Sequence, residues 1–281
     1  MVPRMGTAVD QLNVTPSGGP LGAFVTGVNL ADLDAATTAA IRAAWLEHLV
    51  LVFPDQPLTS EQYLAFAETI GTPAEYPFVE GLDGNPFIIE VLKLPSETVN
   101  FGGIWHADTV YLERPPMASM LLSKEIPPVG GDTEFANQYA AWDALPADIQ
   151  AQLDGTTAMN SSAAAMSIRN TADRMSDEQV AQVFESRHPA VRTHPETGRK
   201  SLYVNVAHTY GLVDVDPAVS APLLEQVFEH QVRDEFVWRL QWEVDMIALW
   251  DNRCCLHNPI NDYHGHTRRM HRITLEGDTP R

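Results

Sequence analysis

Apolar and polar positions alternate along the chain in patterns that divide it into short elements. Residues 34–48 carry apolar side chains at helical spacing, and an unbroken apolar run follows at residues 49–53. This order predicts a helix followed by a buried strand. A second helix is predicted after Thr59, because its hydroxyl and the Gln62 side chain can satisfy each other's exposed backbone donors. Gly71 is predicted to end that helix.

From residue 86 onward the pattern changes to short β-prone segments separated by proline and glycine. Many short strands with such turn signals are typical of a sandwich or barrel. Helical periodicity returns twice, at residues 137–153 and 217–234. We predict a hairpin within residues 191–206, and strands at residues 87–92, 105–111, 118–123, 133–136, 236–242, 245–250 and 270–275. The expected fold class is mainly β with flanking helices (α+β).

The chain shows no sign of being divided into several domains. It has no internal repeat, and neither half has a composition of its own, so we expect a single domain over residues 1–281. Residues 161–187 are polar, alanine-rich and only weakly periodic. We interpret this segment as an insertion or lid over the main sheet, because long insertions often cover functional sites.

Composition and charge narrow the range of partners. The 281 residues include 18 basic and 37 acidic side chains, and the formal charge of −19 argues against nucleic acid or an anionic membrane. No segment approaches the roughly 20 apolar residues that span a bilayer. Residues 1–14 lack the apolar core of a secretory signal, so a cytoplasmic location is expected by default. The two cysteines, Cys254 and Cys255, are adjacent, which excludes a disulfide framework and predicts buried, reduced thiols.

A candidate metal site begins at His106, which stands two residues before Asp108 in a predicted strand. Residues two apart on a strand project from one face, so this imidazole and this carboxylate can take neighbouring positions on a divalent ion. His257 follows an apolar strand and is the third candidate ligand. Two histidines and one carboxylate form the facial triad of non-haem Fe(II) sites. Taken alone, a His-x-Asp pair is more often a surface or capping pair.

Three arginines follow His257 within fifteen residues, at positions 268, 269 and 272. In a strand, Arg268 and Arg272 share one face and offer two guanidinium groups to anions near the metal. The alternative interpretation is a solvated basic patch close to the end of the chain. In a protein with a charge of −19, cations concentrated beside a candidate metal site still require an explanation.

Together these motifs resemble the taurine dioxygenase and dichlorophenoxyacetate dioxygenase family of Fe(II)- and 2-oxoglutarate-dependent oxygenases. The similarity extends over nearly the whole chain, and the motifs are specific in combination although each is weak alone. They are Trp105-His106-Ala107-Asp108, Pro115-Pro116, Gly130-Gly131-Asp132-Thr133, the segment from His188-Pro189 to Asn205, Trp250-Asp251-Asn252-Arg253, His257, and the spacing to Arg268 and Arg272.

The resemblance implies a double-stranded β-helix (jelly roll) with iron at the mouth of the barrel. It implies that His106, Asp108 and His257 hold Fe(II), and that 2-oxoglutarate is bound by Thr133 and Arg268, with Trp250 either beside it or in the core. Arg272 is then expected to bind an anionic group of a small-molecule substrate. Tyr76, Asn100 and Phe101 are the remaining candidate substrate residues, and a homo-oligomer is a further expectation that the family brings.

The activity implied is oxidative decarboxylation of 2-oxoglutarate to succinate and CO2, with O2 hydroxylating a substrate C–H bond. Taurine is not the expected substrate, because Pro73 stands where taurine dioxygenases have a histidine, and Gly102-Gly103 lies near their substrate-binding asparagine. Asp108 also argues against halogenation. The alternatives are a metal-dependent hydrolase or isomerase on a similar barrel, which needs no keto acid, and a binding protein without catalysis.

Overall fold

A computed structural model describes residues 12–76, 79–100, 102–163 and 183–281 of the protein. Its largest element is an eight-stranded sheet, and β5 (Ile89–Lys93) joins this sheet through a pairing with β16. The other strands, in spatial order, are β1 (Asn13–Pro16), β2 (Ala23–Thr26), β3 (Val50–Phe53), β14 (Ile247–Asp251), β6 (Ala118–Glu125), β16 (Arg268–Leu275) and β4 (Pro73–Ala74). The pairing of β2 with β3 is parallel, and the others in this sheet are antiparallel.

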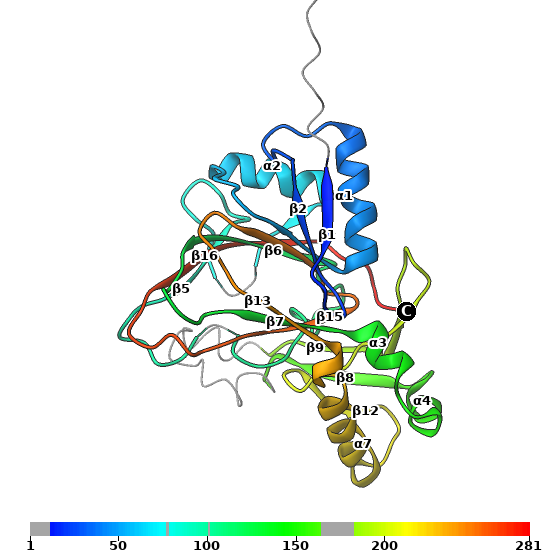
Figure 1. Ribbon diagram of the computed structural model, residues 1–281. Coiled ribbons are helices and arrows are strands. Elements are labelled where there is room, and N and C mark those ends of the chain that lie inside the picture. The colour runs from blue at the N-terminus through cyan, green and yellow to red at the C-terminus, as the bar shows by residue number, and fades with distance from the viewer. Residues whose placement is uncertain (1–11, 77–78, 101, 164–182) are drawn as a thin grey trace, which may run out of the picture.

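A second layer lies below the large sheet in Figure 1. It is an antiparallel sheet of β13 (Val237–Leu240), β7 (Thr133–Asn137) and β15 (Cys255–Pro259). Two smaller sheets follow it: β12 (Thr209–Leu212), β8 (Thr157–Ser161) and β9 (Glu185–Pro189), and the hairpin of β10 (Val191–Thr193) and β11 (Lys200–Leu202). The described residues are therefore mainly β, as the sequence predicts.

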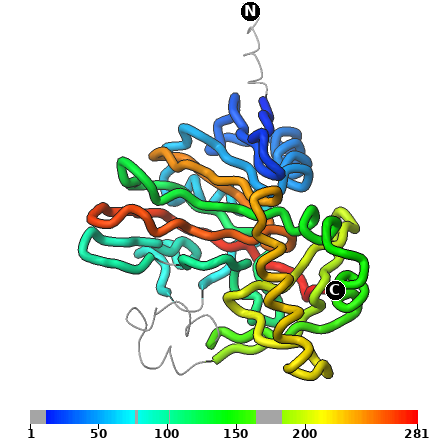
Figure 2. The backbone as a smooth tube through the Cα atoms, turned by 60° about the horizontal axis from the view of Figure 1, so that its bottom comes forward, coloured from blue at the N-terminus to red at the C-terminus, as the bar shows by residue number. Residues whose placement is uncertain are grey.

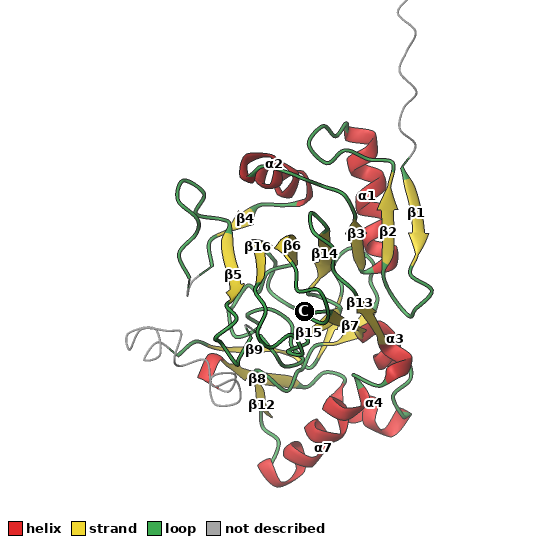
Figure 3. Cartoon of the chain, turned by 60° about the vertical axis from the view of Figure 1, so that its left-hand side comes forward, coloured by secondary structure: helices red, strands yellow, loops and turns green. Residues whose placement is uncertain are grey.

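Helices cover the outside of this β structure. The helices α1 (Ala35–His48) and α2 (Ser60–Ile70) lie on the large sheet, and α3 (Gln138–Asp143), α4 (Ala147–Leu153) and α7 (Pro217–His230) gather at the opposite end of the molecule (Figure 3). A short 3-10 helix, Asp234–Phe236, leads into β13. Thr59 and Gln62 form the predicted capping box at the start of α2. None of the helices described is long and apolar enough to cross a membrane.

The central strands of the large sheet, β3, β14, β6 and β16, are buried on both faces, which explains why they contain continuous apolar runs in the sequence. In β3, Leu51 and Phe53 join the core beneath α1 and α2, whereas Val50 and Val52 join the core that faces β7 and β13. In β16 the same alternation sends Ile273 and Leu275 toward the helices. It thereby turns the alternate positions 268, 270 and 272 toward the space between the two sheets.

Most predicted elements are present, but two predictions are wrong in detail. Residues 105–111 are not a strand: only His106 makes a bridge, to His257, and Thr109 has a φ of 43° in the turn that follows. The helix predicted at 137–153 is two helices, because Pro146 lacks the N–H that would continue the first. The sequence does not predict the strands β1, β2, β4, β8, β9 and β12.

Two further predictions concern the insertion at residues 161–187 and the two cysteines. Most of the proposed insertion at 161–187 lies outside the described residues. The C-terminus lies near the end of the molecule where α3 and α4 gather (Figure 2). The carbonyl of Arg281 accepts a hydrogen bond of 2.7 Å from Thr193 N, and Arg192 is paired with Asp278. Both cysteines are buried and reduced, as predicted.

Candidate active site

His106, Asp108 and His257, which we call the triad, converge in the space between the two sheets. The backbones of His106 and His257 are joined by two hydrogen bonds, of 3.0 and 2.8 Å, so their rings lie 4.1 Å apart. The Nε2 atoms of His106 and His257 lie 3.6 and 3.8 Å from Asp108 Oδ1. All three side chains are buried, and their ligand atoms lie within 4.8 Å of one another.

The spacing of these atoms suits a shared ion better than direct hydrogen bonds. A nitrogen–oxygen hydrogen bond spans about 2.7–3.2 Å, and the two Nε2 distances to Asp108 exceed that range. Ligand atoms about 2 Å from one ion are on the order of 3–4 Å from one another. In addition, His106 Nδ1 lies 2.7 Å from the carbonyl of Ile104, which fixes the proton on Nδ1 and makes Nε2 the nitrogen that could hold a metal ion.

Asp108 is oriented by a chain of hydrogen bonds from the large sheet. Ser119 of β6 donates its hydroxyl to Asp108 Oδ2, and Asn252 donates to Ser119 Oγ at 2.9 Å. The indole of Trp250 in turn donates to Asn252 Oδ1 at 3.0 Å. Sequence reasoning missed Ser119, whose only signal is a polar residue at an inward-facing position of an apolar strand.

Charged neighbours set the ionisation of Asp108. Burial raises the pKa of its carboxyl, but Arg272, His257 and His106 together outweigh burial and hold that pKa well below its usual range. Arg272 Nη2 lies 2.9 Å from Asp108 Oδ1. Asp108 is therefore a carboxylate over the ordinary pH range, which is the form that binds a cation.

A cavity of about 40 Å³ opens beside the triad, lined by residues of both sheets: Val91, Gly102, His106, Leu121, Thr133, Trp250, His257, Pro259, Arg268 and Arg272. Arg268 is buried and donates from Nε to the carbonyl of Gly131 at 3.0 Å. Its Nη2 has no hydrogen-bond partner in the described part of the chain, and burial lowers its pKa. Thr133 Oγ1 accepts a hydrogen bond from Trp242 at 3.0 Å. A buried guanidinium and a hydroxyl thus face one small cavity.

Trp250 takes part in both of the settings that the sequence left open. It is 1% exposed within the core that faces β7, and its ring lies 4.9 Å from that of His257 at the wall of the cavity. Arg268 and Arg272 do share the inward face of β16, as predicted, whereas Arg269 points outward and pairs with Glu90 at 3.1 Å.

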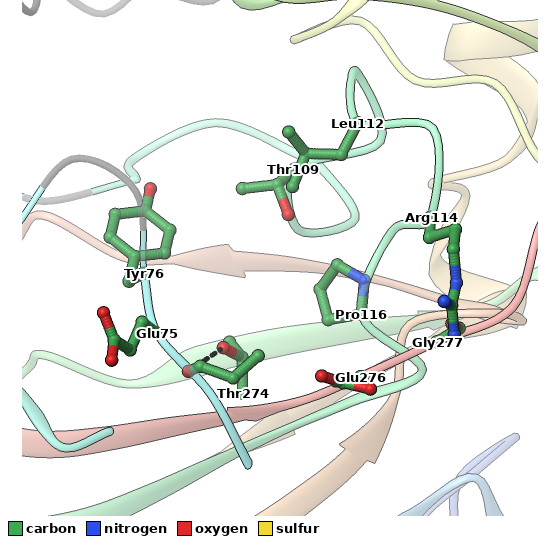
Figure 4. Close-up of a pocket in the computed structure, with 10 residues that line it drawn as sticks. Glu75, Tyr76, Thr109, Leu112, Arg114, Pro116, Thr274, Glu276 and Gly277 are labelled. Carbon is green, nitrogen blue, oxygen red and sulfur yellow. Dashed lines mark hydrogen bonds between the residues drawn. The ribbon is translucent and has the colours of Figure 1, made fainter. Parts of the chain in front are cut away.

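A second cavity, of about 200 Å³, is lined by Tyr76 and by Thr109, the residue after Asp108. The Arg272 guanidinium sits 5.0 Å from the ring centre of Tyr76. Figure 4 shows Thr109 and Leu112 on one side of the cavity, and Thr274 and the carboxylates of Glu75 and Glu276 on the other. Arg272 therefore contacts both Asp108 of the triad and a residue in the wall of a space large enough for a small organic group.

Asn100 and Phe101 are the remaining candidate substrate residues. Asn100 is buried and donates from Nδ2 to the carbonyl of Pro259 at 2.9 Å. It lines a third, smaller cavity together with Lys93 and Tyr263. Phe101 lies outside the described residues. The substrate roles of both residues stay predictions.

A second group with metal-ligand chemistry was not foreseen. His194, Asp251 and Cys254 also bring ligand atoms within 4.8 Å of one another, and all three are buried. Asp251 accepts hydrogen bonds from Arg253 Nε, Arg253 Nη2 and His194 Nε2, and Arg253 also pairs with Glu196 at 2.8 Å. We call His194, Glu196, Asp251, Arg253 and Cys254 the Asp251 network.

Comparison with known proteins identifies the family. Residues 13–274 match the family described as taurine catabolism dioxygenase TauD, TfdA family. The match covers nearly all of the chain, so the protein belongs to this dioxygenase family. The resemblance inferred from the motifs is confirmed.

Individual relatives cover most of the chain as well. It is 34% identical to an alpha-ketoglutarate-dependent sulfate ester dioxygenase of Pseudomonas putida, over 96% of this chain and 91% of that protein. It is 35% identical to an (S)-phenoxypropionate/alpha-ketoglutarate-dioxygenase of Sphingobium herbicidovorans, over 87% and 88% of the two chains. The crystal structure of AAD-2 with Mn(II) and N-oxalylglycine is similar with a TM-score of 0.80 and 27% identity, covering 96% and 99% of the chains.

Proposed function

We propose that this protein is an Fe(II)- and 2-oxoglutarate-dependent dioxygenase that hydroxylates a small anionic substrate. The observation that carries the proposal is the convergence of His106 Nε2, His257 Nε2 and Asp108 Oδ1, at distances that suit an ion, beside a buried arginine. In this proposal the three side chains of the triad would hold Fe(II), and the ion would bind the keto acid and O2. Membership of a dioxygenase family supports it.

Arg268 and Thr133 are the proposed contacts for the distal carboxylate of 2-oxoglutarate. A guanidinium that is 5% exposed and whose Nη2 has no hydrogen-bond partner among the described residues is costly unless an anion binds it. The Thr133 hydroxyl lines the same cavity and can donate to a carboxylate oxygen while it accepts from Trp242. Trp250 closes the wall next to His257 and excludes water from this side.

Arg272 and Tyr76 are the proposed contacts for the substrate. The guanidinium of Arg272 contacts Asp108 of the triad and Tyr76 in the wall of the cavity of about 200 Å³, so an anionic group bound to it would hold a carbon atom near the metal. Relatives that are named for sulfate esters and for phenoxypropionate favour a substrate with a sulfate, sulfonate or carboxylate group.

The residues of the chain would divide the work as follows. Bound iron would supply the activation of O2, in which the keto acid loses CO2 and becomes succinate, and one oxygen atom enters the substrate C–H bond. Asp108 and the two histidines hold the metal, and Ser119 fixes the carboxylate oxygen that faces away from it. Arg268 orients the keto acid and Arg272 orients the substrate. The apolar side chains that line the cavity beside the triad, Val91, Leu121 and Trp250, keep water out.

We also propose that the two facing sheets are the halves of a double-stranded β-helix and that the chain forms one domain. Support comes from the burial of the large sheet on both faces: the core between β3 and the second layer also contains residues of β6, β14 and β16. A structural neighbour that covers 96% of the chain is consistent with one continuous unit.

The proposal is tested by anaerobic addition of Fe(II) and 2-oxoglutarate, followed by oxygen and a panel of small sulfates, sulfonates and aryloxy acids. We expect a visible metal-to-ligand charge-transfer band, and substrate-dependent succinate on admission of O2. The variants D108A and H257A should lose both signals while they keep the circular dichroism spectrum of the wild type.

Two results would contradict the proposal. Succinate formation by both D108A and H257A would remove the triad from the reaction. A wild-type protein that binds Fe(II) but gives neither the band nor succinate would favour the hydrolase or isomerase alternative, in which a metal-bound water acts without a keto acid.

A further inference from the structure

Lys93 is a buried cation that the roles assigned above leave unused. It is the last residue of β5 and is 2% exposed. Within the described part of the chain, its Nζ has no hydrogen-bond partner and no carboxylate lies within 4.0 Å of it. Its positive charge lies over the ring of Tyr263, whose centre is 4.4 Å away. An ammonium group in such a setting has lost its water without gaining an anion.

Lys93 and Arg268 are direct neighbours across the sheet. Their Cα atoms are partners in the antiparallel pairing of β5 with β16, so their side chains leave the same face of the sheet. Both line a cavity of about 10 Å³, together with Asn100 and Tyr263. Arg268 and Val91 line this small cavity and also the one beside the triad, so the two spaces adjoin.

Two buried like charges directly opposite each other destabilise a sheet. Asp132 offsets the charge of Arg268 only in part, because its carboxylate is bonded to Arg239 at 2.7 Å and burial still lowers the pKa of Arg268. Arg268 has a backbone carbonyl as its acceptor, from Gly131, and Lys93 has an aromatic ring. The arrangement therefore lacks one anion, positioned between Lys93 and Arg268 at the end of the cavity farther from the triad.

We propose that Lys93 is a second positive contact for the distal carboxylate of the keto acid, and that it sets the preference for a dicarboxylic keto acid. The inference rests on the proposed function, because it assigns Lys93 to the same cosubstrate. The small cavity has the volume of about one water molecule or one carboxylate oxygen, which is enough to bring the carboxylate within reach of Nζ. Lys93 is a binding and positioning residue, since it lies away from the reacting atoms.

The test compares two keto acids that differ only in the distal group. 2-Oxoglutarate and 2-oxopentanoate have the same five-carbon chain, and only the first carries a carboxylate at its far end. Their Kd values are measured by anaerobic calorimetry with Mn(II)-loaded wild type and with K93M, which keeps the length and apolar stem of lysine. For K93M we expect the Kd of 2-oxoglutarate to rise on the order of tenfold to a hundredfold, the usual effect of losing a charged hydrogen-bond donor.

The Kd of 2-oxopentanoate should change less than twofold in K93M. In turnover, the KM for 2-oxoglutarate should rise while kcat at saturation is maintained. The matched control is K124M. Lys124 lies on β6, which pairs with the other side of β16, and it is paired with Asp245 at 3.7 Å, so its removal should leave both Kd values unchanged. If K93M folds poorly, K93Q provides a second uncharged variant with the same expected selectivity.

Two outcomes would overturn the assignment of Lys93 alone. Equal weakening of both keto acids would mean that Lys93 only supports Tyr263 and the local packing, and an unchanged Kd for 2-oxoglutarate would mean that the carboxylate does not reach Nζ. A wild-type protein that binds neither keto acid would instead overturn the proposed function, so the two failures are distinguishable.

Discussion

The triad and the Asp251 network each take one residue from the same short stretch of sequence, since Asp251 ends β14 and His257 belongs to β15, the next strand. Each contains a buried histidine near a buried aspartate, and each gathers three ligand atoms within 4.8 Å. In the network, His194 Nε2 lies 3.0 Å from Asp251 Oδ2, a hydrogen bond. In the triad, the corresponding nitrogen–oxygen distances are 3.6 and 3.8 Å.

The difference lies in how completely each cluster satisfies its own polar atoms. His194 Nδ1 accepts hydrogen bonds from the backbone of Glu196 and Thr197, so its proton is on Nε2, and Nε2 donates to Asp251. Arg253 fills the remaining positions of the Asp251 carboxylate. His106 has the opposite tautomer, with its proton directed to the carbonyl of Ile104. The same residue types thus form a closed structural network in one place and a site open to an ion in the other.

The largest expected effect is on stability, from D251N. Burial raises the pKa of Asp251, but Arg253 and His194 more than reverse this and lower it. A lowered carboxyl pKa gives stability that is present above the unfolded-state pKa and is lost as pH falls through the folded-state pKa. At pH 7, D251N leaves Arg253 buried beside a neutral amide, and we expect unfolding free energy to fall by about 3–5 kcal/mol. Urea denaturation measures it.

D108N is the matched variant in the triad. Asp108 accepts a side-chain hydrogen bond from Ser119 and pairs with Arg272 at 2.9 Å, and Arg272 keeps its contact with Tyr76 when the charge is removed. We therefore expect D108N to lose less than half as much stability as D251N in the same urea experiment. Equal losses would mean that both aspartates are structural, and the contrast between the clusters would fail.

The next effect is stabilisation by metal, which should belong to one cluster only. A ligand at a hundred times its Kd stabilises the folded state by about 2.7 kcal/mol. With Mn(II) at that concentration, we expect this gain for wild type and for C254S, which alters the Asp251 network, and no gain for H257A. Thermal denaturation with and without Mn(II) measures it. A gain retained by H257A and lost by C254S would mean that the metal binds in the Asp251 network and not at the triad.

The sequence predicts most of the fold because its central strands are buried on both faces. Residues 50–53 of β3 and 247–250 of β14 are apolar, and β16 carries Arg268 and Arg272 on one face, as expected. The prediction of a strand at 105–111 is wrong because the side chains there are buried by tertiary contacts in a turn, which local patterns do not distinguish from a strand. The short strands β1 and β2 pair at the edge of the sheet and have too few residues for a periodic signal.

For the candidate site, the sequence identifies residues that approach one another through strand pairing. It predicts that His106, Asp108 and His257 meet, and the structure brings them together. It does not reveal Lys93 or Ser119, because their importance depends on which side chains lie opposite, and that follows from the register of β5 and β6. It also gives no means of separating the triad from the Asp251 network, since hydrogen-bond satisfaction is a three-dimensional property.

The smallest expected effect comes from Ser119, which connects Asp108 to Asn252. In S119A, Asp108 Oδ2 loses its hydroxyl donor, so the carboxylate is held less firmly toward the two histidines. Loss of such an orienting contact typically weakens metal binding by 10–100-fold, and we expect about tenfold because Arg272 still holds Oδ1. Calorimetric titration with Mn(II) gives the affinity. S123A is the control, because Ser123 is equally buried on the same face of β6 but bonds to the backbone of Glu243 and Met246. Equal weakening in both variants would show that the strand, rather than the Ser119 hydroxyl, orients Asp108.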